Sequence, residues 1–170
     1  VTRELGPVLA GLMVMHRKRL PKVQVLAAAT PALAVGHAIG RIGCFLVGDD
    51  YGRPTNLPWG IAFPEGLPPT AVPVHPTQLY EAAALLPLVI LLMRWRRSGR
   101  PARFVLGAYL VLAGVVRFAI EFLRVNERVL GALSVAHVAS IGVMVIGGAL
   151  LLDNRRRTLQ GELRPREHHT

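Results

Sequence analysis

The amino-acid sequence predicts an all-α integral membrane protein with about five transmembrane helices. Hydrophobic residues make up 52% of the 170 residues, and the mean hydropathy is +0.41, which is more apolar than an ordinary soluble domain. The apolar residues gather in stretches of about the 20 residues needed to cross the hydrocarbon of a bilayer. Basic residues cluster at the ends of these stretches, as they do on the cytoplasmic side of membrane proteins.

Five apolar stretches are the expected helices. In chain order they are Leu5 to Met15, Val23 to Phe45, Thr77 to Met93, Phe104 to Leu123 and Ala132 to Leu152. The first and third are short and need flanking residues to complete a crossing. The first also looks clipped, and the valine at position 1 indicates either an unusual start codon or residues missing upstream. It lacks the basic leader and small-residue cleavage site of a removable signal peptide.

The basic residues predict the orientation of these helices. Of the 20 Lys and Arg, 14 lie in three clusters: Arg17, Lys18, Arg19 and Lys22; Arg94, Arg96, Arg97, Arg100 and Arg103; and Arg155, Arg156, Arg157, Arg164 and Arg166. With five spans all three clusters lie on one face, which the positive-inside rule makes cytoplasmic. We therefore expect a transmembrane domain over residues 1–152 and a basic, disordered cytoplasmic tail over 153–170. Because topology accounts for the net charge of +10, no nucleic-acid partner is expected.

The segment between the second and third spans faces outward. Residues 54–76 contain seven prolines, which favours an extended or turn-rich loop and argues against a helix. Trp59 and Phe63 either lie at the level of the lipid headgroups or belong to a solvated connector. Cys44 is the single cysteine, so neither an intramolecular disulfide nor a cysteine metal cage can form. We expect no metal and no other cofactor.

Residues 40–53 place charge at the outer end of an apolar helix, where charge is costly and usually functional. One face of this helix carries His37, Arg41, Cys44 and Gly48, and a neighbouring face carries Gly36, Gly40 and Gly43. The glycines would allow another helix to approach closely. Arg41 is then expected to point into the bundle, where a guanidinium can bind a phosphate with two hydrogen bonds. The alternatives are an ion pair with Asp49 or Asp50, or snorkelling to the headgroups.

Two further motifs carry polar groups at the same membrane face. The first is His75-Pro76-Thr77-Gln78-Leu79-Tyr80-Glu81, at the start of the third span; it either caps and anchors the helix or binds a headgroup or a peptide. The second places Arg117, Glu121 and Arg124 on one helix face. These three either compensate each other's charge or bind an anionic ligand. His137, with Ser134 and Ser140, is a weaker candidate that interhelical hydrogen bonds can explain.

The motifs together bring charged and polar groups to the outward face. They are Arg41, Asp49, Arg53, His75, Tyr80, Glu81, Arg117, Glu121 and Arg124. This convergence favours an anionic amphiphile as the ligand, and a phospholipid is the obvious candidate.

The same motifs resemble a known family. Gly40-Arg41-Ile42-Gly43-x-Phe45 followed by Gly48-Asp49-x-x-Gly52-Arg53, then the 75–81 motif, then Arg117-Phe118-x-x-Glu121-Phe122-x-Arg124 occur in the order and with the spacing of the bacterial prolipoprotein diacylglyceryl transferases. The resemblance covers residues 5–152. It implies an enzyme of the bacterial inner membrane that transfers the diacylglyceryl group of phosphatidylglycerol to the lipobox cysteine of a prolipoprotein signal peptide, the first step of lipoprotein maturation.

The resemblance also implies roles for individual residues. Arg117 and Glu121 would form a second essential charged pair and be catalytic. The resemblance does not identify the base; from the residues alone we place His75 in that catalytic role for its outward position, with His37 as the alternative. Substrate binding would fall to Arg41, Asp49, Gly52, Arg53, Tyr80, Glu81 and Arg124. The acceptor thiol would come from the prolipoprotein, so Cys44 would not be the nucleophile.

The sequence departs from the family pattern at several positions. The family's His-Gly-Gly motif is replaced by Thr2-Arg3-Glu4-Leu5, and family members have a longer amino-terminal part with about seven spans. A family asparagine is Cys44, a glutamate is Asp49, a tyrosine is Ala113, and a Gly-Gln pair is Ala136-His137. Two alternatives therefore stay open: a related membrane protein that binds phospholipid or peptide without catalysis, and an unrelated small transporter.

Overall fold

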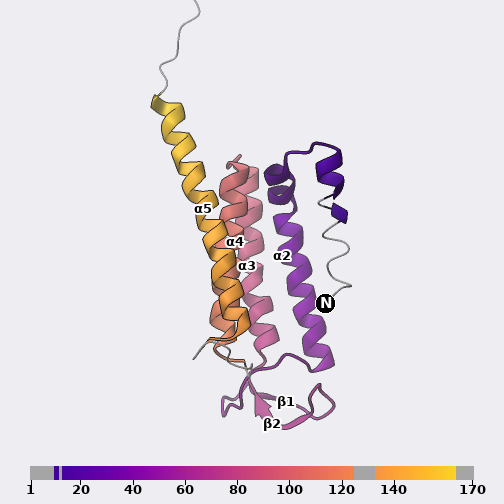
Figure 1. The fold of residues 1–170 in the computed structure, drawn as a ribbon. Helices are drawn as coiled ribbons and strands as arrows, with labels where there is room; N and C mark the ends of the chain where they lie inside the picture. Colours follow the sequence, from indigo (N-terminus) through magenta and orange to yellow (C-terminus); the bar gives the residue numbers. More distant parts are fainter. Residues whose placement is uncertain (1–9, 12, 125–132, 164–170) are drawn as a thin grey trace, which may run out of the picture.

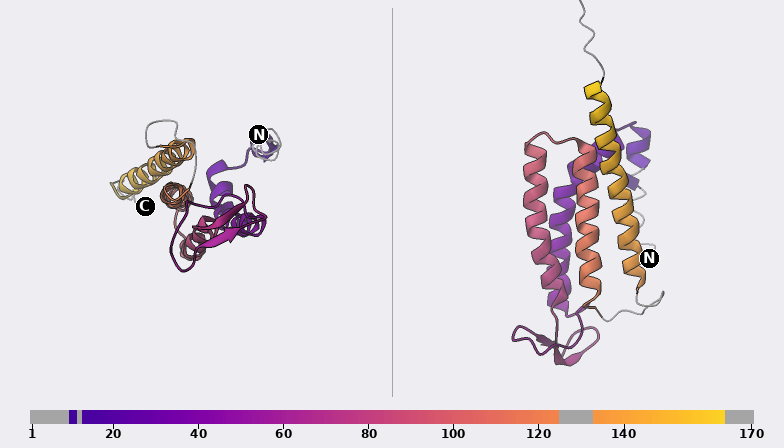
Figure 2. Two further views of the ribbon diagram at one scale, coloured as in Figure 1. Left: turned by 90° about the horizontal axis from the view of Figure 1, so that it is seen from below. Right: turned by 90° about the vertical axis from the view of Figure 1, so that its left-hand side faces the viewer.

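Four long helices run side by side and a small β-hairpin closes one end of the bundle (Figure 1). The computed structural model describes residues 10–11, 13–124 and 133–163. Its elements are α2 (Lys22–Val47), β1 (Ile61–Phe63), β2 (Thr70–Val74), α3 (Thr77–Arg97), α4 (Ala102–Glu121) and α5 (Val135–Leu163). Successive helices run in opposite directions along the bundle (Figure 2).

The four helices are each long and apolar enough to cross a membrane. They coincide with four of the five predicted spans, which confirms an all-α, multi-pass membrane protein. Of the first predicted span, residues 10, 11 and 13–15 are described and helical, and the others lie outside the described residues.

The basic clusters lie at one end of the bundle, as predicted. The start of α2, the end of α3, the start of α4 and the end of α5 lie together at the end of the bundle opposite the hairpin (Figure 1). These ends carry Lys22, Arg94 to Arg103 and Arg155 to Arg157. The described basic clusters therefore share one face; the side of the membrane that they occupy stays a prediction.

Prolines and one glycine set the helix boundaries. Pro21, Pro76 and Pro101 directly precede α2, α3 and α4, since proline suits the entry to a first helical turn, where no N–H is needed. At the other end of α2, Gly48 takes a left-handed conformation with φ 72°, which favours glycine. Its N–H donates to the carbonyl oxygen of Cys44 at 3.0 Å. The chain turns sharply there towards the hairpin.

The core of the bundle joins small side chains of α2 to leucines of α3. Ala34 is fully buried on α2, and Leu85 and Leu92 of α3 are 1% and 0% exposed. Val105 of α4 completes the same cluster. Alanines let the backbones of α2 and α3 approach closely, which brings the polar residues at their hairpin ends within contact of each other.

The proline-rich loop contains no helix among its residues 54–76, in agreement with the prediction. Its strands are antiparallel, with Ile61 opposite Val74 and Phe63 opposite Thr70. The strand pairing was not predicted. Phe63 stacks on Tyr51, with ring centroids 5.5 Å apart, and packs edge-on against Phe45. Its ring therefore fastens the hairpin to the end of α2, whereas Trp59 is 55% exposed.

The predicted close approach at the glycine face of α2 is wrong for the described residues. A Cβ atom added at Gly36, Gly40 or Gly43 would meet no described atom within 4 Å. The close approach lies between α4 and α5 instead. A Cβ at Gly147 would come within 2.7 Å of the carbonyl oxygen of Gly107.

The end of the last helix also differs from the expectation. The tail was expected to be disordered from Asp153, but α5 continues to Leu163. Asp153 pairs with Arg103 of α4 at 2.8 Å and with Arg157 one turn later at 3.0 Å. These pairs stabilise the added helical turns. Residues 164–170 lie outside the described residues.

The contact between α4 and α5 generates a stability prediction. Gly147→Val should lower the thermal unfolding midpoint in detergent, because the side chain would be forced against the α4 backbone, at a cost of about 1–3 kcal/mol. Gly148→Val is the matched control, since a Cβ at Gly148 meets nothing within 4 Å. Equal midpoints for the two variants would contradict the packing of α4 on α5.

Candidate functional site

A cluster of charged side chains lies where α2, α3, α4 and the start of α5 reach the hairpin end of the bundle. Its guanidinium groups are those of Arg41, Arg117 and Arg124, and its carboxylates are those of Asp50, Glu81 and Glu121. We call these six residues, with His37, Ser134 and His137, the polar cluster. Three cations face three anions, so the six ionic groups balance in charge when the histidines are neutral.

Glu81 is the carboxylate that joins α2 to α3. It is 1% exposed, and its two oxygens meet different partners: Oε2 lies 3.2 Å from Arg41 Nε, and Oε1 lies 3.1 Å from His37 Nε2. His37 and Arg41 are one helical turn apart, so both reach the same carboxylate. Arg117 of α4 also acts electrostatically on Glu81, which links this pair to the next one.

Glu121 is the buried carboxylate on α4. Arg117, one turn earlier on the same helix, places Nη1 at 2.7 Å from Glu121 Oε2. Ser134, before α5, donates from Oγ to Glu121 Oε1 at 2.6 Å. The backbone N–H of Ser134 in turn donates to His137 Nδ1 at 3.1 Å. The predicted Arg117–Glu121 pair therefore forms, and the hydrogen bonds predicted for Ser134 and His137 tie it to α5.

Asp50 bridges two arginines from opposite sides of the bundle. Its Oδ2 lies 2.9 Å from Arg41 Nη1, and its Oδ1 is hydrogen-bonded to Arg124 Nη2. The residue takes a left-handed backbone conformation, with φ 58°, which aspartate tolerates better than most residues. Thr77 at the start of α3 donates to the Asp50 carbonyl oxygen at 2.9 Å and holds the turn.

The charge around Asp50 sets its protonation. Partial burial alone would raise the pKa of this carboxyl, but the hydrogen bonds and positive charges of Arg41 and Arg124 bring the pKa below its ordinary value. Asp50 therefore stays ionised at neutral pH. Its side chain is 41% exposed, against 1% for Glu81 and Glu121, so it is the most accessible anion of the cluster.

The structure brings together five of the residues predicted from sequence: Arg41, Glu81, Arg117, Glu121 and Arg124. His75 and Tyr80 lie in a separate group. His75 Nδ1 is 3.3 Å from the Tyr80 hydroxyl, which also accepts a hydrogen bond from Trp59 Nε1 at 2.7 Å. Arg53 is exposed.

Gly52 and Asp49 hold the backbone of the site in the structure. A Cβ at Gly52 would come within 2.7 Å of both the Leu123 carbonyl oxygen and Thr77 Cγ2, so only glycine fits this junction of three segments. The carbonyl oxygen of Asp49 accepts a hydrogen bond from Gln78 Nε2. The Asp49 side chain interacts with the Cys44 thiol, whereas the neighbouring Asp50 contacts Arg41.

Sequence reasoning gave too little weight to Asp50 and His37. The ion pair of Arg41 with Asp50, one of the alternatives from the sequence, forms in the structure. His37 was placed on one helix face with Arg41 and named as an alternative base, but its contact with Glu81 was not predicted. The one-turn spacing of His37 and Arg41 was a usable signal for His37. The bridging role of Asp50 had no local signal, because Arg124 is 74 positions away in the chain.

One trio of side chains has the composition of a metal site. Cys44, Asp49 and Asp50 place their ligand atoms within 4.8 Å of one another. Since the Asp50 carboxylate already pairs with two arginines, a cation there would have to compete with both guanidinium groups. We assign no metal to this trio.

Comparison with known proteins finds a family match over most of the chain. A family model described as "Prolipoprotein diacylglyceryl transferase" matches residues 4–152. Similar curated proteins are named phosphatidylglycerol–prolipoprotein diacylglyceryl transferase. The one from Geobacter sulfurreducens is 38% identical over 159 residues, which cover 90% of this chain and 60% of that protein. The one from Cupriavidus pinatubonensis is 36% identical over 95% of this chain and 60% of its own length.

A third relative has the same coverage. The protein of that name from Finegoldia magna is 31% identical over 93% of this chain and 62% of its own length. The chain therefore spans about three fifths of the length of the curated relatives that it matches.

The lowered pKa of Asp50 predicts a pH-dependent contribution to stability. Because the folded pKa is below the unfolded value of about 3.9, the stabilisation is complete above that pH and is lost as the pH falls through the folded pKa. The gap in thermal midpoint between the parent protein and Asp50→Asn should be constant near neutral pH and should shrink in acid. A gap that widens in acid would contradict the assignment.

Proposed function

We propose, because this chain belongs to the prolipoprotein diacylglyceryl transferase family, that it transfers a diacylglyceryl group from phosphatidylglycerol to the lipobox cysteine of a prolipoprotein. The observation that carries the proposal is the pair of guanidinium groups, from Arg41 and Arg124, that converge on one exposed carboxylate. Two such groups can bind the phosphate diester of a lipid headgroup in the same way.

The proposed setting is the bacterial inner membrane. The matched relatives are bacterial proteins, and the positive-inside rule would place the basic end of the bundle and the carboxyl terminus in the cytoplasm. The hairpin and the polar cluster would then face outward. The proposed partners, phosphatidylglycerol and the prolipoprotein signal peptide with its lipobox, would reach the cluster from that side of the bilayer.

Binding would begin with displacement of Asp50. The polar cluster is balanced in charge without substrate, so an entering phosphate must replace one of its anions. Asp50 is the least buried of the three carboxylates and lies between the two arginines. The donor phosphate would take its place between Arg41 and Arg124, while Glu81 keeps the Arg41 guanidinium in position.

The chemistry requires one bond to form and one to break. The acceptor thiol would lose its proton to a base. The thiolate sulfur would then attack the carbon of the diacylglyceryl group that is bonded to the phosphate ester oxygen. A C–S bond forms, the C–O bond to the phosphate breaks, and the electron pair leaves with glycerol phosphate. Fixed arginines would stabilise the charge that develops on the departing phosphate, and their positive field would also favour the thiolate.

His37 is the better-placed base of the two histidines considered. Its Nε2 lies 3.1 Å from the buried Glu81 carboxylate, and the residue lies one turn from Arg41. A carboxylate partner orients the ring of a histidine. His75, in contrast, contacts Tyr80 and would belong to the rim of the site, where it can position a headgroup or a peptide.

The first prediction tests the transfer reaction. In cells depleted of their own transferase, the full-length protein should add the mass of a diacylglyceryl group to a lipobox reporter, measured by mass spectrometry. Arg41→Ala should reduce this adduct by at least about a hundredfold, as for the loss of one transition-state hydrogen-bond donor. Arg97→Ala is the control, because Arg97 is exposed at the opposite end of α3.

The outcomes separate the two functional alternatives. An adduct that depends on Arg41 supports the transferase. Absence of an adduct at normal protein levels, together with retained binding of phosphatidylglycerol, would favour a binding protein instead. Equal loss from both substitutions would contradict the placement of the site at the hairpin end.

The second prediction distinguishes the histidines. His37→Gln keeps a hydrogen-bond donor towards Glu81 but cannot take up a proton at neutral pH. It should lower the rate of transfer about a hundredfold or more, as loss of a general base does, and remove the acidic limb of the pH–rate profile. His75→Gln should raise the phosphatidylglycerol concentration needed for half-maximal rate and leave that limb in place. The reverse pattern would assign the base to His75.

A further inference from the structure

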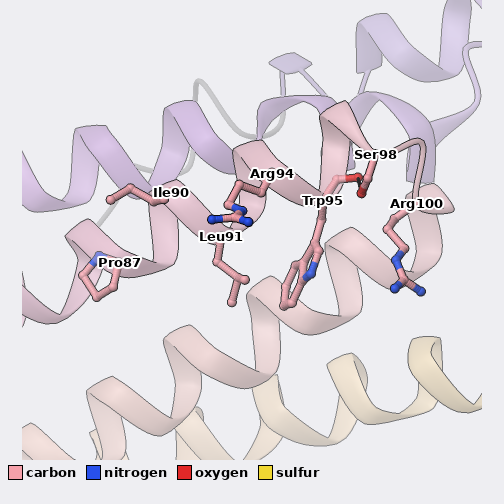
Figure 3. Close-up of a pocket in the computed structure, with 7 residues that line it drawn as sticks. All are labelled: Pro87, Ile90, Leu91, Arg94, Trp95, Ser98 and Arg100. Carbon is pink, nitrogen blue, oxygen red and sulfur yellow. Dashed lines mark hydrogen bonds between the residues drawn. The ribbon is translucent and has the colours of Figure 1, made fainter.

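A groove lies on the surface of α3 at the end far from the polar cluster, beside the turn into α4. Its volume is about 660 Å³, within the range of small-molecule sites. Figure 3 shows its lining residues in order along the helix, from Pro87 to Ser98, with Arg100 in the turn. The groove is open to the surface of the bundle.

The lining changes character along the groove. Pro87, Ile90 and Leu91 form its apolar part, nearer the middle of α3, and Ile90 is 60% exposed. Arg94 and Arg100 form the other part, at the basic end of the bundle. Figure 3 shows the Arg94 guanidinium beside Leu91 and the Arg100 guanidinium beyond Trp95. Apolar side chains next to separate positive charges suit a phospholipid, whose acyl chains are apolar and whose headgroup is charged.

The two arginines are available for an anion. Within the described part of the chain, neither Arg94 nor Arg100 forms an ion pair, whereas Arg103 and Arg157 both pair with Asp153. Arg96, on another side of α3, donates to the Ala28 carbonyl oxygen at 2.9 Å. The groove thus carries two uncompensated positive charges next to apolar surface.

Trp95 gives the groove a fixed wall. Its indole packs edge-on against Phe104 of α4, with ring centroids 5.1 Å apart. Arg100 lies over the same Phe104 ring, 5.4 Å from its centroid, so cation–π attraction holds the guanidinium beside the groove. Tryptophan is favoured at the headgroup level of a bilayer, which places the groove at the depth where a phosphate would lie.

We propose that this groove binds one anionic phospholipid of the leaflet at the basic end of the bundle. Arg94 and Arg100 attract its anionic headgroup, and an acyl chain packs against Ile90 and Leu91. The site is separate from the proposed donor site, because Trp95 lies 14 residues beyond Glu81 on α3, roughly 21 Å along the axis. A lipid held here cannot reach the polar cluster, so the proposal does not depend on the proposed reaction.

Trp95 makes the proposal directly testable. The chain has two tryptophans, so Trp59→Phe leaves Trp95 as the only reporter. This variant is placed in phosphatidylcholine vesicles that contain either dibrominated phosphatidylserine or, at equal mole fraction, dibrominated phosphatidylcholine. The bromines of either lipid quench the fluorescence of a tryptophan in contact with its acyl chain. Phosphatidylserine is chosen because it is anionic, whereas phosphatidylcholine carries the same phosphate without net charge, and because it is not the proposed donor. Phosphatidylserine should bind beside Trp95 roughly fivefold more tightly than phosphatidylcholine. This factor is about the contribution of one arginine near an anionic membrane surface.

Substitutions test whether the preference for phosphatidylserine depends on the arginines of the groove. Arg94→Gln with Arg100→Gln should abolish it, whereas Arg97→Gln with Arg156→Gln, which removes the same charge from the same membrane face, should retain it. Circular dichroism and size-exclusion chromatography establish that each variant is folded. Equal quenching by the two lipids would overturn the proposal, as would the same loss in both double variants. Protection of Trp95 from both lipids would also overturn it, because a protein segment would then cover the groove.

Discussion

The burial of Glu81 constrains much of this structure. A carboxylate that is 1% exposed inside a membrane bundle is stable only if cations or donors meet both of its oxygens. Arg41 and His37 meet them from α2, so α2 and α3 have to pack in one register. The alanines of α2 make this possible, because they allow the backbones to approach until the polar side chains touch. The same register brings Asp50 into contact with Arg124 at the end of the bundle. The close packing at Gly52 holds the turn that carries Asp50.

The outer loop follows from the same constraint. The chain leaves α2 at Gly48, and Asp50 and Gly52 must then lie against the start of α3 and the end of α4. The close contacts at Gly52 leave no space for a side chain, and the hairpin is fastened to α2 through Phe63 and Tyr51. The proline-rich segment therefore packs against the end of α2 through Phe63.

The helices could be predicted from the sequence because the length of an apolar run and the position of basic residues are local properties. The pair of Arg117 and Glu121 was also predictable, since its partners are one turn apart. The contact of Asp50 with Arg124, 74 positions away, depends on how the helices are arranged, which no local pattern encodes. The same holds for α5, whose extension beyond Asp153 depends on Arg103 of a different helix. The glycine spacing gave a wrong prediction for a related reason. It indicated that a helix could approach α2 closely at Gly36, Gly40 and Gly43, but it could not identify α4 and α5 as the helices that pack closely through other glycines.

The two ends of α3 show how charge balance can separate two kinds of lipid contact. At the hairpin end three carboxylates neutralise three guanidinium groups, so an anion gains little unless it displaces one of them. Displacing Glu81 or Glu121 would leave a buried carboxylate unpaired, at a cost of several kcal/mol, whereas Asp50 can turn towards solvent. In the proposed reaction the donor phosphate would therefore enter between Arg41 and Arg124. At the basic end Arg94 and Arg100 have no such counter-charge among the described residues, so the proposed lipid headgroup would bind there without displacing a carboxylate. The first arrangement suits a substrate that must come and go, and the second suits a lipid that stays.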